Sequence, residues 1–204
     1  MGHFLVYFRS GHNININMAY EYFHYEQLQP RHIRILEVEP SPHPSGIISC
    51  RCIHVPLEDR SHKYVAVSYT WGSPQKPCRL LVNGHLLNIT QTVHDIFQSK
   101  IMAEPRTLIW IDAICINQEN LEEKARQVRF MGEVFSHAES TRVWLGPESQ
   151  ESSLAISFIR TLFSILPEIE TGNMERTLYY AMKYQEAGPE WVALAHLLSR
   201  PWFT

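Results

Sequence analysis

The stretch YVAVSYTWG, from Tyr64 to Gly72, decides the fold of this chain. It begins with four apolar or aromatic residues in a row, and such a run is typical of a strand that is covered on both faces of a sheet. It ends in hydroxyl side chains and an indole, which a core strand does not need. The sequence therefore predicts a strand inside the sheet whose carboxyl end is polar enough to form a site.

Two further strands, the first of them buried, and two helices follow this strand along the chain. The strands are expected at TLIWID (107–112) and TRVWLG (141–146), and the helices at 91–101, capped by Thr90, and after the cap Asn120. Strands that alternate with helices of this length pair in parallel through right-handed crossovers. We therefore predict the α/β class, with a flavodoxin-like parallel sheet and helices on both of its faces.

Two other features complete the predicted organisation. Asn83-Gly84 lies between two apolar runs, which is the strongest short signal for a β-hairpin. A helical segment is expected at the C-terminal end. We divide the chain into a poorly defined N-terminal segment (1–25) and one domain (26–204) with a core (64–166) and a helical tail (173–204).

The composition narrows the classes of partner. The 204 residues carry a formal net charge of -3 without a sustained run of Lys or Arg, so we expect neither nucleic acid nor a membrane surface as partner. The longest apolar stretch falls short of the roughly 20 residues that a membrane span needs. The amino terminus lacks the features of a secretory signal, so a cytoplasmic location is expected.

The four cysteines are too few and too scattered for a disulfide framework, so free thiols are expected. Cys50, Cys52 and His54 alternate on one face of a predicted strand and offer three of the four ligands of a zinc site. The sequence places no fourth ligand beside them, and a half-buried strand with small side chains explains the same pattern. We predict no metal site.

Polar residues follow the predicted parallel strands at their carboxyl ends, which meet at one edge of an open sheet. An indole and a phenol offer flat stacking surfaces, while a carboxylate, amides and a hydroxyl offer hydrogen bonds. This set suits a nucleotide-like ligand, and we call it the candidate rim: Ser68, Tyr69, Trp71, Gly72, Asp112, Asn117 and Gln118. The alternative is structural, with the hydroxyls and Asp112 satisfying the backbone of the turns that they begin.

Three stretches of the sequence resemble a known family. YVAVSYTWG (64–72), LIWIDAICINQENLEEKARQVRFMGEVFSHAESTRVWLG (108–146) and LLSRPWFT (197–204) are similar, in this order, to the signature blocks of the heterokaryon incompatibility domain of filamentous fungi. The resemblance implies a role in non-self recognition, in which fusion of incompatible cells triggers growth arrest or programmed cell death. The family is held to be distantly similar to Toll/interleukin-1 receptor domains, which either self-associate in signalling or cleave NAD.

The resemblance leads to two hypotheses. In the first, the chain is a signalling domain that acts by self-association or by docking to a protein partner. In the second, it is an enzyme that cleaves NAD at the candidate rim, with Glu122 and Glu123 as secondary candidates for a carboxylate. Related sequences continue past RPWFT to a glutamate that corresponds to the catalytic one of NAD-cleaving relatives, whereas this sequence ends at Thr204. We therefore favour the signalling domain and name NAD only as the substrate of the alternative, with no cofactor.

Overall fold

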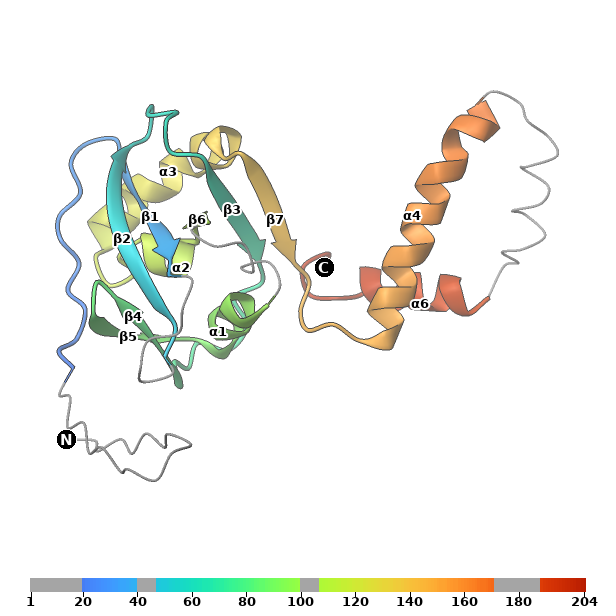
Figure 1. Cartoon of the computed structure of the whole chain (residues 1–204), viewed down its shortest axis with the longest axis horizontal. Coiled ribbons are helices and arrows are strands. Elements are labelled where there is room, and N and C mark those ends of the chain that lie inside the picture. The colour runs from blue at the N-terminus through green and yellow to red at the C-terminus, as the bar shows by residue number, and fades with distance from the viewer. Residues whose placement is uncertain (1–19, 40–46, 100–106, 171–187) are drawn as a thin grey trace. The chain divides into compact units, whose positions relative to one another are not determined.

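The computed structural model describes residues 20–39, 47–99, 107–170 and 188–204 (Figure 1). It consists of two compact units, residues 1–144 and 145–204, which are considered separately below. Most of the N-terminal segment expected at 1–25 lies outside the described residues. The first part of the helical tail expected from residue 173 does so as well.

A seven-stranded sheet forms the first unit. Its strands are β1 (His32–Val38), β2 (Ser49–Pro56), β3 (Tyr64–Tyr69), β4 (Cys78–Val82), β5 (His85–Ile89), β6 (Leu108–Trp110) and β7 (Ser140–Trp144). They are ordered β5-β4-β2-β1-β6-β3-β7 across the sheet. Together with the helices of this unit, the sheet confirms the α/β class.

The sheet is mixed, whereas the alternation of strands and helices predicts a parallel sheet in which only the hairpin at Asn83-Gly84 is antiparallel. β6, β3 and β7 are parallel to one another, as expected. β1 is antiparallel to both of its neighbours, β2 and β6. The crossover rule applies only to strands that are joined through helices. β1 and β2 instead pair antiparallel with each other and lie between β6 and β4, so the rule does not determine their direction.

β3 lies inside the sheet, between β6 and β7, which confirms the prediction from its apolar run. Tyr64, Val65, Ala66 and Val67 are each at most 5% exposed. The Tyr64 hydroxyl donates a hydrogen bond of 2.6 Å to the carbonyl of Val134. This bond joins the strand to a helix of the first unit, α3 (Leu121–His137).

The hairpin predicted at Asn83-Gly84 is present. β4 and β5 pair antiparallel up to Val82 and His85, so the turn contains only these two residues. Both have positive φ angles, 51° for Asn83 and 79° for Gly84, as expected of a two-residue turn that follows the twist of the strands.

The helix caps of the first unit also follow the prediction. α1 (Gln91–Gln98) begins after Thr90, whose hydroxyl accepts a hydrogen bond of 3.3 Å from the N–H of Val93. α3 begins after Asn120, whose side chain accepts one of 3.0 Å from the N–H of Glu123. Each cap satisfies a donor that the helix itself leaves free.

Apolar spacing predicts one buried face of α3, formed by Leu121, Ala125, Val128, Met131, Val134, Phe135 and Ala138. The second half of the helix follows this prediction, because Val134 is buried and Met131, Phe135 and Ala138 pack against the core, but the first half differs. Leu121 and Val128 belong to the expected apolar stripe, yet they are 78% and 50% exposed. Glu123 and Gln127 are buried in their place. The reason is Arg34 on β1, a buried cation whose ion pair with Glu123 turns that side of the helix toward the sheet.

The second unit contains the helices α4 (Gln150–Glu170) and α6 (Pro189–Leu198), which pack against each other. Pro189 occupies the first turn of α6, where its missing N–H costs no helical hydrogen bond. The ring of Phe158 on α4 meets Trp191 on α6 edge-to-face, with centroids 4.8 Å apart. A small buried cluster lies between the helices, formed by Ala155, Ala193 and Leu197.

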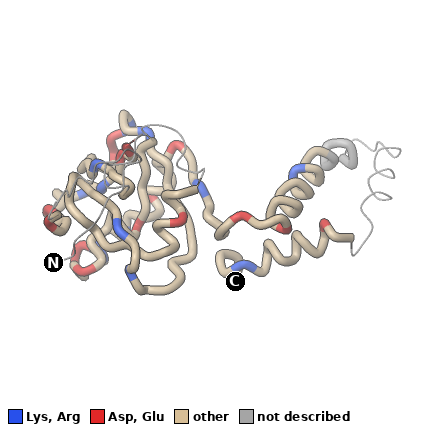
Figure 2. Tube along the Cα trace, turned by 60° about the horizontal axis from the view of Figure 1, so that its bottom comes forward, with Lys and Arg blue, Asp and Glu red and all other residues tan. Residues whose placement is uncertain are grey.

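Charge and hydropathy along the described chain are those of an ordinary folded protein. Figure 2 shows basic and acidic residues interspersed along the trace of each unit. Of the helices in the described ranges, none combines the length and the hydropathy required to cross a bilayer.

Candidate functional site

The carboxyl ends of β3 and β6 lie at the same edge of the sheet. Ala66 of β3 is paired with Trp110 of β6, and the two strands are parallel. Ser68 and Asp112 each follow these partners by two positions, so the chain brings both of them to this edge. The sequence predicts that Asp112 is the last residue of β6. In the structure, Asp112 is instead the first residue of the short helix α2 (Asp112–Cys115).

Trp71 and Asp112 form the centre of the candidate rim. The indole N–H of Trp71 donates a hydrogen bond of 2.9 Å to a carboxylate oxygen of Asp112. The ammonium group of Lys124 lies 5.9 Å from the centroid of the indole ring, at the outer limit of a cation–π contact. Trp71 is still 43% exposed, so a flat ligand has access to the indole.

Two polar side-chain atoms of the candidate rim are buried, the hydroxyl of Tyr69 and the oxygen of Gln118. The Gln118 oxygen has no hydrogen-bond partner among the described residues, whereas the Tyr69 hydroxyl lies beside the Asp112 carboxylate. The amide nitrogen of Gln118 donates a hydrogen bond of 2.8 Å to the backbone carbonyl of Asp112. The side-chain oxygen of Gln118 therefore lies close to Asp112. Burial, and then the Asp112 carboxylate, raise the pKa of Tyr69 above its ordinary value. A buried atom without a partner, such as the Gln118 oxygen, is costly unless water or a ligand satisfies it.

Gly72 shapes the loop that carries Trp71. Its φ angle is +69°, and a Cβ atom added to it would lie 2.8 Å from the side-chain oxygen of Thr92 on α1. A side chain at position 72 would therefore be strained by its backbone conformation and would also clash with the helix.

Ser68 lies in the sheet and Asn117 in the turn before α3. Ser68 is half-buried and is paired with Val143 of β7. The side-chain oxygen of Asn117 accepts a hydrogen bond of 3.2 Å from the N–H of Glu119, so this amide stabilises the turn before α3.

The two secondary candidates differ sharply. Glu122 is on the surface and forms an ion pair of 2.9 Å with Arg126, one helical turn further on. The buried Glu123 uses both of its oxygens: Oε1 accepts from Arg34 at 2.5 Å and from the N–H of Asn117 at 2.8 Å, and Oε2 accepts from Arg34 at 3.0 Å. Glu123 is thus buried and committed to its ion pair with Arg34, which favours a structural role over contact with a substrate.

Burial alone would raise the pKa of Glu123, but hydrogen bonds from the Arg34 guanidinium and the N–H of Asn117 outweigh burial and lower it. Sequence reasoning missed Arg34 because an arginine in the alternating strand HIRILEV is typical of a solvent-facing position. The Arg34 side chain is fully buried. The capping role of Glu123 hid its second role, since Asn120 and Glu123 already fit a helix start.

The thiols and imidazoles considered for zinc do not form a metal centre. The described residues contain no group of three or more His, Cys, Asp or Glu side chains suited to a metal ion. Cys50 is buried in the core, whereas Cys52 and His54 line a cavity beside β2. Burial raises the pKa of the Cys52 thiol to about 11.

Comparison with known proteins gives the chain a family. The family model described as "Heterokaryon incompatibility protein (HET)" matches residues 64–204. A curated relative from Neurospora crassa, "Heterokaryon incompatibility protein 6, OR allele", is 32% identical over an alignment of 136 residues, and the match covers 60% of this chain and 20% of the relative. No solved structure matches the chain. The chain belongs to the heterokaryon incompatibility (HET) protein family, as the three sequence blocks indicate.

Proposed function

We propose that this chain acts in fungal non-self recognition as a cytoplasmic signalling domain that leads to programmed cell death. It works in this proposal by self-association or by docking to a protein partner. Membership of the family and the name of the Neurospora relative support a role in incompatibility. The chain spans about a fifth of that relative, so the activity and partners of the whole protein belong to the proposal.

The observation that carries the interaction hypothesis is the set of large apolar side chains exposed on the second unit. Phe163 on α4 is 69% exposed. The others are between 37% and 48% exposed and come from both helices and the C-terminal turn: Leu154, Ile156, Trp191, Val192, Leu198, Trp202 and Phe203. Exposed apolar groups in such numbers favour a protein contact. Tyr179 and Tyr180, which the sequence adds to this set, lie outside the described residues.

Sedimentation of the purified chain over a wide range of concentrations tests self-association. We expect the average mass to rise with concentration for the wild-type chain. The rise should be weaker in the double variant Phe163→Ser, Phe203→Ser, because less apolar surface is removed from water. Val128→Ser, at an exposed position on α3, is the matched control. An equal rise of the average mass in both variants and the wild type would show that the exposed residues Phe163 and Phe203 do not form the contact.

A second candidate function, cleavage of NAD, is favoured by one observation at the candidate rim. Gln118 leaves a buried polar atom without a partner among the described residues, close to the exposed indole of Trp71 and to a carboxylate that also faces the Tyr69 hydroxyl. Such a set suits the hydroxyls of a ribose and a flat ring. Against it, Asp112 is already held by Trp71 and by the N–H of Ala113, which donates a bond of 2.7 Å.

Release of nicotinamide from NAD by the purified chain separates the two functions. We expect little or no turnover, because the charge of Glu123 is balanced by Arg34 in a buried pair and Asp112 is held in its own loop by Trp71 and Ala113. Asp112→Ala and Glu119→Ala form a matched pair, the latter on the exposed turn before α3. Robust turnover that disappears only in Asp112→Ala would replace the signalling proposal by an enzymatic one.

A further inference from the structure

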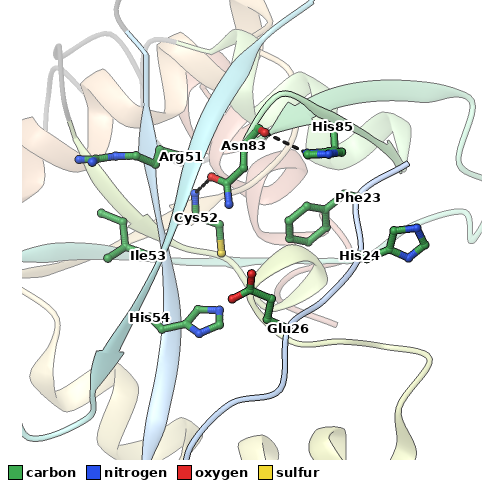
Figure 3. Close-up of a pocket in the computed structure, with 9 residues that line it drawn as sticks. All are labelled: Phe23, His24, Glu26, Arg51, Cys52, Ile53, His54, Asn83 and His85. Atoms are coloured by element: carbon green, nitrogen blue, oxygen red, sulfur yellow. Dashed lines mark hydrogen bonds between the residues drawn. The ribbon is translucent and has the colours of Figure 1, made fainter. Parts of the chain in front are cut away.

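A cavity of about 660 Å³ opens beside β2 (Figure 3). It is bounded by the segment before β1, the middle of β2 and the turn between β4 and β5. The residues that line it include Phe23, Glu26, Cys52, His54 and Asn83. No residue of the candidate rim lines it, so this is a separate place in the fold.

β2 is paired along its whole length on one side only. Its register with β1 runs from Cys50 to Pro56, but its register with β4 contains just Ser49 and Cys50. In an antiparallel pair, alternate residues direct both backbone groups toward the partner strand. The N–H of Leu57, just after β2, donates a hydrogen bond to the carbonyl of Arg31, just before β1. The odd-numbered residues of β2 therefore direct their backbone N–H and C=O groups toward β1.

The even-numbered residues therefore direct their backbone groups toward the cavity. Asn83 covers the first of these positions: its N–H donates to the carbonyl of Cys50 at 2.9 Å, and its side-chain oxygen accepts from the N–H of Cys52 at 2.8 Å. Beyond this point, the carbonyl of Cys52 and both backbone groups of His54 have no hydrogen-bond partner among the described residues. β2 thus has a short open edge.

The cavity also has a defined charge. Figure 3 shows the Glu26 carboxylate directed toward Cys52 and His54. Among the described residues, this carboxylate makes no ion pair or hydrogen bond. Arg51, a cation that lines the cavity, is held by Glu37 through a bond of 3.0 Å, and the charge of the nearby Arg34 is balanced by Glu123. An unpaired carboxylate beside an open strand edge favours a partner that brings both backbone groups and a cation.

We propose that the open edge of β2 is a docking site for an extended peptide segment of a protein partner, which adds a strand at Cys52 and His54 and places a Lys or Arg side chain beside Glu26. Main-chain hydrogen bonds supply affinity in this mode, and side-chain pockets supply specificity. The inference rests on the proposed function for the existence of a protein partner. It uses the first unit, whereas the apolar residues discussed for self-association belong to the second.

Two short blocked peptides added to the full chain test the docking site: acetyl-Thr-Val-Lys-Val-Thr-amide and its counterpart with Glu in place of Lys. Without peptide, the His54 amide should exchange its hydrogen rapidly, while Ile53 and Val55, which face β1, exchange slowly. The lysine peptide should slow exchange at His54. It should bind on the order of tenfold more tightly than the glutamate peptide, which corresponds to about 1.4 kcal/mol.

Glu26→Gln should remove the preference for the lysine peptide while the protection of His54 remains. Glu119→Gln, which changes an exposed carboxylate far along the chain, should alter neither. Unchanged exchange at His54 with either peptide, or equal binding of the two peptides, would overturn the docking site. Concentration-dependent self-association in the same preparation would leave the proposed function standing, so the two failures are distinguishable.

Discussion

At the scale of single residues, the pair Arg34–Glu123 joins parts of the chain that are 89 positions apart. The guanidinium also donates to the carbonyl of Cys115 at 3.1 Å and to that of Glu26 at 2.6 Å, and it lies 4.9 Å from the ring of Tyr25. One cation thereby connects β1, the segment before it, the end of α2 and the start of α3. Its loss would leave several buried groups unpaired at once.

Glu123→Ala should lower the free energy of unfolding by about 3–5 kcal/mol, because it leaves the buried Arg34 without its counter-ion. Glu122→Ala is the matched control, since it breaks only an exposed pair with Arg126, worth about 0.5 kcal/mol or less. Urea unfolding of the three proteins measures both changes. Similar losses for the two variants would mean that the buried pair does not stabilise the fold as described.

The same pair predicts a pH dependence. The pKa of Glu123 is lowered from its ordinary value of 4.5, so the folded state favours the charged carboxylate. Its contribution to stability is complete above about pH 4.5 and is lost as the pH falls through the lower folded pKa. The difference in unfolding free energy between wild type and Glu123→Gln should therefore shrink below pH 4.5. A gap that stays constant down to the acid limit would contradict this assignment.

At the scale of elements, two glycines show how backbone conformation decides the effect of one methyl group. Gly84 forms the hairpin turn with a φ angle of +79°, where a side chain is strained even though the space is open. Gly132 lies inside α3, has a helical backbone, and also has nothing within 4 Å of an added Cβ. Replacement by alanine should thus lower the free energy of unfolding at position 84 and raise it at position 132.

We expect Gly84→Ala to destabilise the chain by about 1 kcal/mol, from the cost of a left-handed conformation. Gly132→Ala should stabilise it by about 0.5–1 kcal/mol, because alanine loses less conformational freedom in a helix. Denaturant unfolding under identical conditions measures the pair. If Gly84→Ala were neutral, the turn would have to relax to another type, which the register at Val82 and His85 does not allow.

What the sequence predicts well at this scale is local. The hairpin at Asn83, the cap at Asn120 and the buried strand from Tyr64 depend on neighbours within a few positions, and all three are confirmed. What it misses depends on distant partners. No local pattern tells that Arg34 is buried, or that Leu121 is exposed because Glu123 faces the sheet. The candidate rim stays a prediction, although Trp71 and Asp112 do meet.

At the scale of the whole molecule, the order of the strands differs from their order along the chain. The family model begins at Tyr64, yet β1 and β2 precede this residue and occupy the middle of the sheet. β1 separates β6 from β2, and β2 separates β1 from β4. The stretch that defines the family therefore depends on strands outside the matched region for its own hydrogen bonds and core.

A fragment that begins at Tyr64 should consequently fail to fold as a cooperative unit. The buried core side chains that it lacks include Ile33, Ile35, Leu36 and Val55. Each contributes about 1.5–3 kcal/mol by burial, so their sum is comparable with the 5–15 kcal/mol that separates a folded domain from its unfolded state. The fragment also leaves one edge each of β6 and β4 unpaired, and it removes the counter-ion of Glu123.

Urea unfolding followed by circular dichroism, for this fragment and for one that begins at Tyr20, decides the matter. The longer fragment keeps all seven strands and should unfold in one cooperative transition. The shorter one should show a gradual change or remain insoluble, since unpaired apolar strand edges favour aggregation. A cooperative transition in the shorter fragment, with the helix and strand content of the longer one, would show that the matched region folds without β1 and β2. In that case the central strands would be an addition to the family core, and the Arg34–Glu123 pair could not be essential to it.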